Sequence, residues 1–348
     1  MRIRTLAYAA LTATLTAALA GCGASEPVPE ESAASSAAGE GVTEYPLTID
    51  NCGTEVTVDA PPERVVSLDQ NSTEILLSLG LEDRVVGTAS WTDPILPELE
   101  AANEDVPRLA DNAPTYEVVL GADPDFITAS FGRHLNETGV ATRDRFAETG
   151  IETYLSPTDC EGDVSINGGG TRTQLLDVES LYTEIREIAA VFDVPSRGDA
   201  LVADLEERTA AALDGVDADG ATVAFWFADT RTPYMAGGYG SAAMLADMSG
   251  MENVFADTPD DWPAMGWEAV VEKNPEVLVL GDLQRARFPG DLLEEKIAFL
   301  ESDPLTKTMD AVKNKRYIAL HGAEMNPSIR SVDGLEKIAE FWKEQDAG

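Results

Sequence analysis

Apolar and polar positions along this chain follow two alternating patterns, one typical of strands and one typical of helices. Residues 45–62 alternate apolar and polar side chains around a central Cys-Gly pair, which predicts a β-hairpin. Residues 63–68 are a short apolar run typical of a buried strand. A helix follows, for which we expect Asn71 or Ser72 to be the N-cap and Gly80 to mark the end.

Strands and helices continue to alternate through the first half of the chain. Buried strands are expected at residues 85–88, 125–129 and 152–155, and a helix is expected at residues 142–149. Strands that alternate with helices form parallel sheets covered on both faces. This half therefore predicts one α/β lobe.

The pattern changes at residue 177 and later returns. Residues 177–213 are almost entirely helical apart from a break near Pro195. A second series of strands and helices follows, which predicts a second α/β lobe. Its expected elements are strands at 221–227, 276–280 and 317–322, helices at 241–250, 291–301 and 332–342, and a Gly-rich loop at 236–240.

One block of the first half recurs in the second half. TYEVVLGADPDFI at residues 115–127 and GWEAVVEKNPEVLVL at residues 266–280 each place an aromatic residue before a glutamate, then an apolar run, and a proline seven residues after the glutamate. The two glutamates are Glu117 and Glu268. Such a block can recur by chance, but the equal spacing at equivalent places favours two topologically similar lobes.

Charge narrows the range of partners. The formal net charge is −39, and the chain has 17 Arg against 7 Lys. This balance argues strongly against nucleic acid or anionic membrane headgroups as general partners. The acidity is typical of a solvated surface tuned to salty surroundings, and a dedicated cation-binding surface is the alternative.

The N-terminus has the pattern of an exported lipoprotein. Residues 1–21 begin with Arg2 and Arg4 and continue as a short run rich in Thr and Ala, which is typical of a signal peptide rather than a membrane span. The end of this run, Leu-Ala-Gly-Cys at residues 19–22, resembles the lipobox of bacterial lipoproteins. The resemblance implies that Cys22 is lipidated and becomes the first mature residue. An ordinary secretory peptide with a chance cysteine is the alternative.

The pattern as a whole predicts an α/β protein made of two lobes. Each lobe has a mostly parallel sheet, a long α-helix joins the lobes, and a ligand cleft lies between them. The segment after the signal peptide is rich in Ser, Ala, Glu, Gly and Pro and is expected to be a flexible tether. The predicted segments are a lipoprotein signal peptide at 1–21, the tether at 22–43, the first lobe at 44–175, connecting helices at 176–215 and the second lobe at 216–348.

The remaining cysteines and the histidines limit covalent and metal chemistry. With Cys22 assigned to lipid, Cys52 and Cys160 are left in an exported chain, and we predict a disulfide between them. Two free thiols are the alternative. His134 and His321 are the only histidines, so a zinc-type ligand cluster is not available, and we expect no metal site and no cofactor.

Candidate ligand-binding residues follow the predicted strands, whose carboxyl ends face the ligand side of open α/β sheets. They are aromatic and cationic in an otherwise anionic chain, although each aromatic taken alone also suits a core position. Arginine offers a fork of donors to carboxylate, catecholate or phosphate oxygens and stacks on rings, so we expect a planar or chelate-type anion. The candidates are Gln70, Asn71, Trp91, Phe131, Arg133, Trp226, Arg231, Tyr234, Trp262, Arg285, Arg287, Met325 and Asn326.

The sequence gives no positive signal for an enzyme. No serine lies in a G-x-S-x-G pattern, and the sequence has no G-x-x-x-x-G-K-[ST]. His321, at the end of a predicted strand, is the better catalytic candidate, but it has no evident nucleophile partner and suits a structural or ligand-rim role. We predict no catalytic residues.

With these residues identified, the chain resembles the extracytoplasmic solute-binding proteins of ATP-driven importers for ferric siderophores, haem and cobalamin. The resemblance covers residues 44–345. Its motifs are ERVVSLDQNSTEILLSLGLEDRVVG, YEVVLGADPDF, the middle helices, WEAVVEKNPEVLVLGD and KIAFLESDPL.

The resemblance implies a rigid connecting helix, modest closure of the lobes on the ligand, and two surface glutamates that dock into arginine pockets of the permease. The docking residues would be Glu117 and Glu268, although acids are also favoured in the first turn of any helix. Aromatic pocket residues of the family precede these glutamates by six positions. That position is Trp262 in the second lobe but Asp111 in the first, which departs from the family pattern.

We expect the ligand to be a ferric siderophore, because the arginines favour an anionic chelate. Cobalamin, haem or another metal chelate in the same importer class is the alternative, and a surface adhesion or interaction lipoprotein is the alternative of a different class. The expected partner is an ABC permease. The chain is expected to be a monomer held at the outer face of the cell membrane only through lipidated Cys22.

Overall fold

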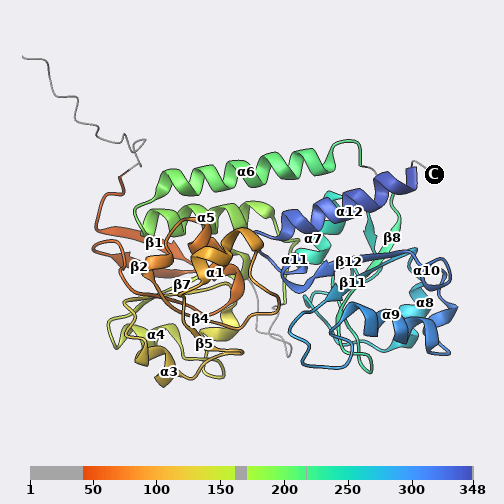
Figure 1. The fold of residues 1–348 in the computed structure, drawn as a ribbon, viewed down its shortest axis with the longest axis horizontal. Coiled ribbons are helices and arrows are strands. Elements are labelled where there is room, and N and C mark those ends of the chain that lie inside the picture. The colour runs from red at the N-terminus through yellow and green to blue at the C-terminus, as the bar shows by residue number, and fades with distance from the viewer. Residues whose placement is uncertain (1–41, 161–170, 217, 347–348) are drawn as a thin grey trace, which may run out of the picture. The chain divides into compact units, whose positions relative to one another are not determined.

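The computed structural model describes residues 42–160, 171–216 and 218–346. The predicted signal peptide, Cys22 and residues 22–41 of the predicted tether lie outside the described residues. Within the described residues, two α/β lobes lie side by side, and the helices α5 and α6 run along one side of them (Figure 1).

The first lobe begins with a hairpin and continues as a parallel sheet. Its strands are β1 Leu47–Asn51, β2 Thr54–Val58, β3 Val65–Ser67, β4 Val85–Ala89, β5 Arg108–Ala110, β6 Phe126–Ala129 and β7 Glu152–Leu155. Its α-helices are α1 Gln70–Ser78, α2 Glu100–Asn103, α3 Tyr116–Gly121 and α4 Arg143–Ala147, and its 3₁₀ helices are η1 Glu82–Arg84, η2 Pro97–Leu99, η3 Gly132–His134 and η4 Pro157–Asp159. β1 and β2 pair antiparallel, as predicted, and the sheet has the all-parallel order β5-β4-β3-β6-β7.

Two helices connect the lobes, as the pattern of residues 177–213 predicts. They are α5 Val178–Val191 and α6 Pro195–Leu213. The break between them comes before Pro195, which stands in the first turn of α6, where its missing N–H costs nothing. α6 is also tied to the second lobe by Arg208, whose guanidinium lies 2.5 Å from Asp333 and 2.9 Å from Glu336.

The second lobe repeats the alternation of strands and helices. Its strands are β8 Thr222–Ala228, β9 Tyr234–Met235, β10 Glu252–Asn253, β11 Val277–Asp282 and β12 Tyr317–His321. Its helices are α7 Ser241–Met248, α8 Trp267–Lys273, α9 Leu293–Ser302, η5 Thr306–Thr308, α10 Asp310–Lys313, α11 Gly322–Met325 and α12 Ser331–Asp346. The sheet order is β10-β8-β11-β12 with parallel pairing, and β9 pairs antiparallel with β8.

The repeated sequence block has the same structural place in both lobes. α3 carries Glu117 and leads into β6, and α8 carries Glu268 and leads into β11. β6 pairs with β3 and β11 pairs with β8, so each block supplies the strand that lies beside the first strand of its sheet. This shared topology confirms the prediction of two similar α/β lobes.

The expected cap of the first lobe's leading helix is wrong by two or three residues. Neither Asn71 nor Ser72 is the N-cap of α1; Asp69 is, because its carboxylate accepts a hydrogen bond from the backbone N–H of Ser72 at 3.1 Å. The strands β5, β9 and β10 were not predicted. Each has only two or three residues, too few to show an alternating pattern.

Each sheet is covered by apolar side chains on both faces. In β8, Phe225 packs with one cluster, while its neighbours Ala224 and Trp226 pack with another on the opposite face. The first lobe shows the same division, because Val65 and Val66 of β3 belong to different clusters. Successive residues of a strand point to opposite faces, so a sheet covered by helices buries nearly every position.

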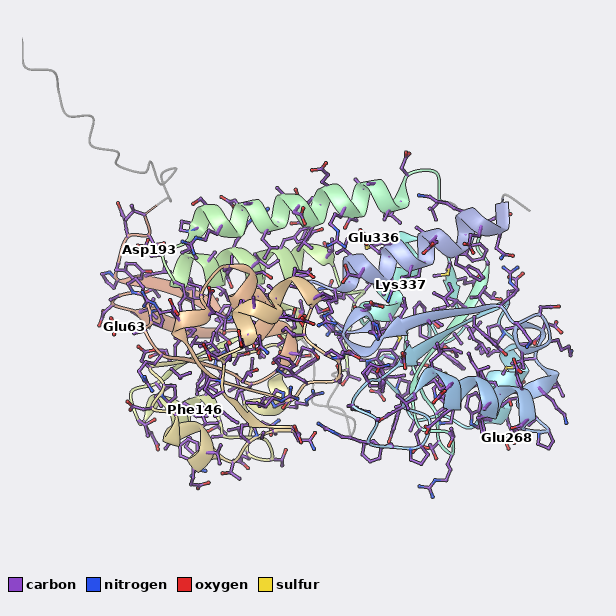
Figure 2. All side chains as sticks on the ribbon, viewed as in Figure 1. Glu63, Phe146, Asp193, Glu268, Glu336 and Lys337 are labelled. Atoms are coloured by element: carbon purple, nitrogen blue, oxygen red, sulfur yellow. A yellow bond between two sulfur atoms is a disulfide. The ribbon has the colours of Figure 1, made fainter. Side chains whose placement is uncertain are left out.

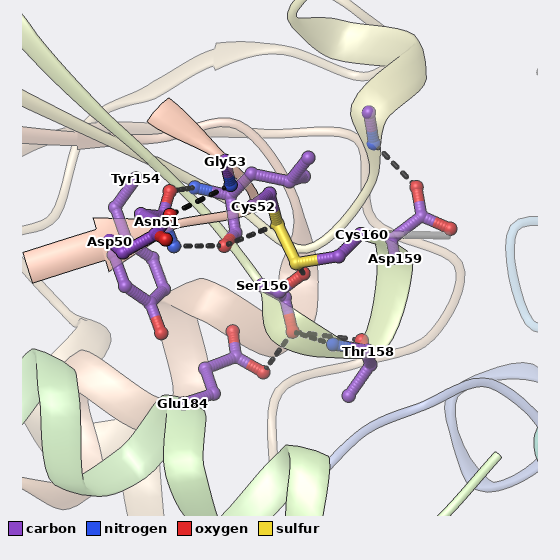
Figure 3. The surroundings of a disulfide bond; sticks show 12 residues. Asp50, Asn51, Cys52, Gly53, Tyr154, Ser156, Thr158, Asp159, Cys160 and Glu184 are labelled. Atoms are coloured by element: carbon purple, nitrogen blue, oxygen red, sulfur yellow. Dashed lines mark hydrogen bonds between the residues drawn. A yellow bond between two sulfur atoms is a disulfide. The ribbon is translucent and has the colours of Figure 1, made fainter. Parts of the chain in front are cut away.

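The predicted disulfide between Cys52 and Cys160 is present, and it fastens the hairpin to the end of η4, the short helix that follows β7 (Figure 3). Beside it, the Asn51 amide donates to the Leu155 carbonyl at 2.7 Å and accepts from the Leu155 N–H at 2.8 Å. The hairpin is therefore held by both covalent and polar contacts. Within the part of the chain that the structure describes, no helix has the length and apolar character needed to cross a membrane.

Candidate ligand-binding site

A cavity of about 280 Å³ opens between the two lobes. Aromatic rings and arginine side chains dominate its walls, and both lobes contribute to it. The lining residues are Thr92, Phe131, Arg133, Phe227, Ala228, Asp229, Tyr234, Ser241, Asp261, Trp262, Arg285, Phe288, Asn326 and Pro327.

The topology of the sheets places these residues together. Phe131 and Arg133 follow β6, Phe227 and Asp229 stand at the end of β8, and Arg285 follows β11. These strands adjoin the point in each sheet where the strand order reverses, and ligands of open α/β sheets bind at such points.

Arg133 is a half-buried cation that faces the cavity. Its guanidinium carbon lies 4.3 Å from the centre of the Phe131 ring, and among the described residues no carboxylate lies within ion-pair distance of it. Burial lowers the pKa of Arg133, and the more distant carboxylates of Asp69 and Asp159 only partly offset this effect. An anion bound in the cavity would therefore supply the counter-charge that Arg133 lacks.

Arg285 is the second cation of the cavity, and it already has a partner. Its Nε and Nη2 atoms donate to the two carboxylate oxygens of buried Asp291 at 3.2 and 3.3 Å. The guanidinium also faces the rings of Phe288 and Phe227, whose centres are 5.6 and 5.8 Å away. Asp291 fixes the position of this arginine, so its outward N–H groups are preorganised.

The second lobe supplies the flat and polar parts of the wall. The rings of Phe227 and Trp262 lie 4.8 Å apart at 39°, which gives an aromatic surface. The Ser241 hydroxyl, at the start of α7, is buried and has no hydrogen-bond partner among the described residues. A buried polar group without a partner is costly, so Ser241 is a candidate donor to a bound ligand.

A buried polar layer lies at the carboxyl ends of β3, β6 and β7. Glu184 of α5 accepts hydrogen bonds from Ser156 at 2.6 Å, Asn71 at 3.4 Å and Ser130 at 3.5 Å (Figure 3 shows the first). Burial raises the pKa of Glu184 to about 8, and repulsion from the nearby Asp69 carboxylate adds to the shift. The layer supports the loops that carry the first-lobe side of the cavity.

A match to a known family indicates what kind of site this cavity is. Residues 65–323, which include both sheets and the connecting helices, match the model of the family described as periplasmic binding protein. The chain belongs to this family. Its members are extracytoplasmic solute-binding proteins, so the cleft between the lobes is the expected place of the solute.

Several periplasmic binding proteins are similar to this chain. A cobalamin-binding protein of Halobacterium salinarum is 28% identical over 345 residues, which is 97% of this chain and 84% of that protein. A vitamin B12-binding protein of Vibrio parahaemolyticus is 24% identical over 219 residues, covering 63% of this chain and 70% of that one.

Solved structures show the same fold. A protein of an ABC-type Fe³⁺-hydroxamate transport system from Saccharomonospora viridis has a TM-score of 0.68 and 27% identity, over 86% of this chain and 99% of that one. A periplasmic binding protein from Veillonella parvula has a TM-score of 0.71 at 24% identity, over 85% of this chain and 96% of that chain.

Most of the predicted ligand residues of this binding protein lie around two adjoining cavities. Phe131, Arg133, Tyr234, Trp262, Arg285 and Asn326 line the cavity described above. Trp91 and Arg287 instead line a neighbouring cavity of about 350 Å³, which shares Thr92 and Arg285 with the first.

The prediction that Trp226 contacts the ligand needs correction, because Trp226 lines neither cavity. It is fully buried, its indole N–H donates to the Ala228 carbonyl at 2.9 Å, and its ring packs edge-on against Trp267 at 4.7 Å. Its neighbour Phe227 faces the cavity instead, because successive strand residues point to opposite faces. Arg231 lies in the exposed turn after β8 and does not line either cavity.

The other candidates at strand ends have structural contacts. Gln70 accepts hydrogen bonds from the backbone N–H groups of Thr92 and Asp93, at 3.0 and 3.1 Å, and so fixes the loop after β4. Asn71 belongs to the buried polar layer, and Met325 is a core residue. The sequence did not indicate several lining residues, among them Phe227, Ser241 and Phe288. Phe288 is a loop aromatic with 58% of its surface exposed.

Several groups of contacts join the two lobes. Buried Arg172 lies 2.9 Å from Asp261 and 3.7 Å from Asp159, which belong to different lobes. Elsewhere, Asp93 of the first lobe accepts a hydrogen bond from the Ala323 N–H at 2.8 Å. The Arg330 guanidinium forms an ion pair with Glu74 of α1 and donates to the Pro94 carbonyl at 2.6 Å.

The two glutamates of the repeated block are exposed on different lobes. Glu117 and Glu268 each stand in the first turn of a helix, α3 and α8. Figure 1 shows both helices away from α6, and Figure 2 shows Glu268 at the outer edge of the second lobe. Within the described residues, no group of three or more His, Cys, Asp or Glu side chains could hold a metal ion.

Proposed function

We propose that this binding protein captures an anionic ferric chelate of the siderophore class outside the cytoplasm and delivers it to an ABC permease. The observation that carries the proposal is the pair of guanidinium groups, Arg133 and Arg285, among aromatic side chains in a chain whose net charge is −39. Cations gathered in one cavity of a strongly acidic protein favour an anionic ligand.

Arg133 supports this proposal most directly. Its guanidinium is half-buried, stacks on Phe131 at 4.3 Å and has no ion-pair partner among the described residues. A catecholate or carboxylate oxygen of a chelate can accept two hydrogen bonds from its planar fork. The Phe227 and Trp262 rings, 4.8 Å apart, would contact the flat organic shell of the same ligand.

Cobalamin is the second candidate ligand. The similarity to the Halobacterium salinarum cobalamin-binding protein extends over 97% of this chain, and aromatic walls suit a flat macrocycle. The arginines favour the ferric chelate as the first candidate.

The place of the protein follows from the same proposal. A signal peptide that ends before Cys22, lipid on that cysteine and a tether of about twenty residues would hold the binding lobes at the outer face of the membrane. Multiple acyl chains anchor a protein firmly, at about 0.8 kcal/mol per buried CH₂. The permease would then receive the ligand from a monomer that diffuses along the same membrane.

A titration of the mature protein with four ligands tests the proposal. The ligands are a ferric tricatecholate, a ferric trihydroxamate, haem and cyanocobalamin. Tryptophan emission, reported by Trp262, and calorimetry give the affinity. We expect saturable binding of the tricatecholate and a loss of about tenfold in affinity for it in Arg133→Gln, because a charge-assisted pair is removed.

Arg145→Gln is the matched control. Arg145 also stacks on a ring, that of Tyr116 at 3.9 Å, but lies on the outer surface of the first lobe away from the cavity. The Arg145→Gln variant should bind the tricatecholate with wild-type affinity. Saturation by cyanocobalamin alone would replace the first candidate by the second, and no binding of any of the four ligands would contradict both.

A further inference from the structure

The second cavity, of about 350 Å³, lies on the seam between the lobes and is built around arginines. Arg108 of β5 comes from the first lobe, and Arg287 comes from the second-lobe loop between β11 and α9. Arg285, on the same loop, lines this cavity and the main one. Three arginines and two aspartates, Asp93 and Asp111, thus line this cavity, in a chain with 63 acidic residues and 24 basic ones.

Arg108 lies over an aromatic wall of this cavity. Its guanidinium carbon lies 4.5 Å from the centre of the Trp91 ring. The ring itself is only 7% exposed, and its indole N–H donates to the Thr88 hydroxyl at 2.9 Å, so the wall is fixed. Stacking on the ring leaves the N–H groups at the edge of the guanidinium directed sideways, where an anion can accept them.

Arg287 reaches across the seam from the other lobe. Its guanidinium donates to the Asn112 side chain and to the Asp111 carbonyl, both in the loop after β5. Its backbone N–H donates to buried Asp291 at 2.9 Å, which fixes the loop that carries it. The two arginines therefore approach one another from opposite lobes with preset geometry.

Three carboxylates, those of Asp93, Asp111 and Asp291, lie near the three arginines of this cavity. Asp93 accepts hydrogen bonds from the Ala323 N–H at 2.8 Å and the Thr92 hydroxyl at 3.0 Å, and Asp291 is paired with Arg285. Asp111 lies 3.9 Å from Arg108, but its side chain is 87% exposed and screened by water. Burial, together with repulsion from Arg287 and against the attraction of Asp111, lowers the pKa of Arg108.

We propose that the cavity between Arg108 and Arg287 is an anion subsite, which takes a carboxylate or phosphate group carried by the ligand. Because Thr92 and Arg285 line both cavities, a ligand in the main cavity can extend such a group into the second one. Pockets for drug-sized ligands have volumes of about 300–1,000 Å³, and the main cavity, at 280 Å³, lies at the small end, so a chelate bound there can use the neighbouring space. An anion there would bridge guanidinium groups of opposite lobes and remove their mutual repulsion.

The inference rests on the proposed function for the source of the anion, and matched ligand pairs test it. One pair is a ferric siderophore complex with free carboxylates and a ferric trihydroxamate without them. The other pair is cyanocobalamin, which carries a phosphodiester, and dicyanocobinamide, which lacks it. Inorganic phosphate alone is titrated as the free anion.

Calorimetry would compare the wild type with Arg108→Gln, Arg287→Gln and the surface control Arg145→Gln. Arg108→Gln and Arg287→Gln, the two seam variants, should each lower the affinity for the anion-bearing ligand by about tenfold. Each should leave the affinity for the matched ligand without the anion within about twofold of the wild-type value. The salt dependence of binding should also become shallower in both seam variants. Thermal melting checks that each variant is folded.

The outcomes separate the subsite from the proposed function. If the affinity for the anion-bearing ligand falls no more in the seam variants than in Arg145→Gln, the subsite is overturned while the proposed function stands. If no chelate or corrinoid binds the wild type, the proposed function fails and the phosphate titration decides the subsite. Phosphate binding that both seam variants lose would support a free anion as the occupant, and no phosphate binding would overturn the subsite.

Discussion

At the scale of single residues, Glu184 is the clearest case of a charge controlled by its surroundings. Its carboxyl group is fully buried in the polar layer of the first lobe, close to Asp69, and among the described residues no basic side chain forms an ion pair with it. Hydrogen bonds from Ser156, Asn71 and Ser130 are not enough to offset the cost of burial, so its pKa rises to about 8.

This shift predicts a pH dependence of stability. The folded pKa of about 8 lies above the ordinary 4.5, so the folded state binds more protons between these values, and stability should fall as pH rises from about 5 to 8. Glu184→Gln keeps a neutral group of the same shape and should remove this decline. We expect the variant to be more stable than the wild type at pH 9 by an amount on the order of a few kcal/mol, and similar to it at pH 5.

Denaturant unfolding at pH 5, 7 and 9 measures the effect. Glu179→Gln, on an exposed position of the same helix, is the control and should follow the wild type across the range. A wild type and a Glu184→Gln variant with parallel pH profiles would show that Glu184 is ionised at neutral pH in the folded protein.

The residues of the candidate site were predictable only in part. Phe131, Arg133 and Arg285 follow strands directly, so the sequence rule for strand ends finds them. Trp226 and Phe227 could not be told apart, because both faces of β8 are buried and the apolar run carries no alternation. Phe288 stands in a loop, whose course depends on contacts far along the chain.

At the scale of elements, the loop between β11 and α9 is held by buried Asp291 and by one buried lysine. Lys296 of α9 is fully buried, donates to the carbonyls of Gly290 and Asp291, and lies 5.2 Å from the Trp226 ring. Burial lowers its pKa to about 8, only partly offset by Asp291 and other nearby carboxylates. The lysine thus closes the base of the loop that carries Arg285, Arg287 and Phe288.

Lys296→Met should therefore loosen this loop without unfolding the lobe. The apolar stem is retained, but two carbonyl groups lose their donor, which favours a mobile loop. We expect ligand affinity to fall by about tenfold and trypsin to cleave faster after Arg285 or Arg287, as identified by mass spectrometry. Lys313→Met, at an exposed position on α10, is the control. Wild-type rates of cleavage in Lys296→Met would contradict this role.

The hairpin is a second element held by identifiable contacts. Its disulfide joins residues 108 positions apart, and the chain-entropy model assigns about 5 kcal/mol to a loop of this length. The double variant Cys52→Ser/Cys160→Ser should lose less, about 2–4 kcal/mol of unfolding free energy. The reason is that the two hydrogen bonds between Asn51 and Leu155 still fasten the hairpin.

Guanidinium unfolding of the double variant measures this loss. The control is the wild type, unfolded once with the disulfide intact and once after a reductant has broken it. An unchanged midpoint would show that the polar contacts alone hold the hairpin.

Long elements were predictable and short ones were not, for a physical reason. α5 and α6 have 14 and 19 residues, and α5 carries its periodic apolar face over nearly four turns. β9 and β10 have two residues each and exist only because β8 lies beside them. Their formation is decided by tertiary pairing, which leaves no local pattern.

At the scale of the whole molecule, contacts on several sides of the cleft tie the lobes together. Arg172 bridges Asp159 and Asp261, and Arg330 binds Glu74 of α1. Fully desolvated charge pairs of this kind are costly to break, because separation leaves a buried charge without a partner. Pairs of this kind oppose a large movement of the lobes, in keeping with the modest closure that the family resemblance implies. We therefore expect the outer faces of the lobes to keep a nearly fixed spacing.

We propose that the two exposed glutamates dock together on the permease, which requires a nearly fixed spacing of the lobes. Glu117 and Glu268 stand on equivalent helices of different lobes, so a permease with two basic pockets at the matching separation would bind both at once. Charged contacts at the rim of an interface mainly set orientation and encounter rate. Glu117→Arg combined with Glu268→Arg should therefore leave ligand affinity unchanged and abolish uptake in cells that carry the cognate permease.

The matched control for this double variant is Glu207→Arg combined with Glu344→Arg, which makes the same change of charge on exposed positions of α6 and α12. Uptake of the labelled ligand should stay near the wild-type rate in the control. Each single variant should retain part of the transport, because one pocket remains engaged. Full uptake by the Glu117→Arg/Glu268→Arg protein would remove the docking role and leave both glutamates as first-turn charges, which stabilise a helix by about 0.3–1 kcal/mol.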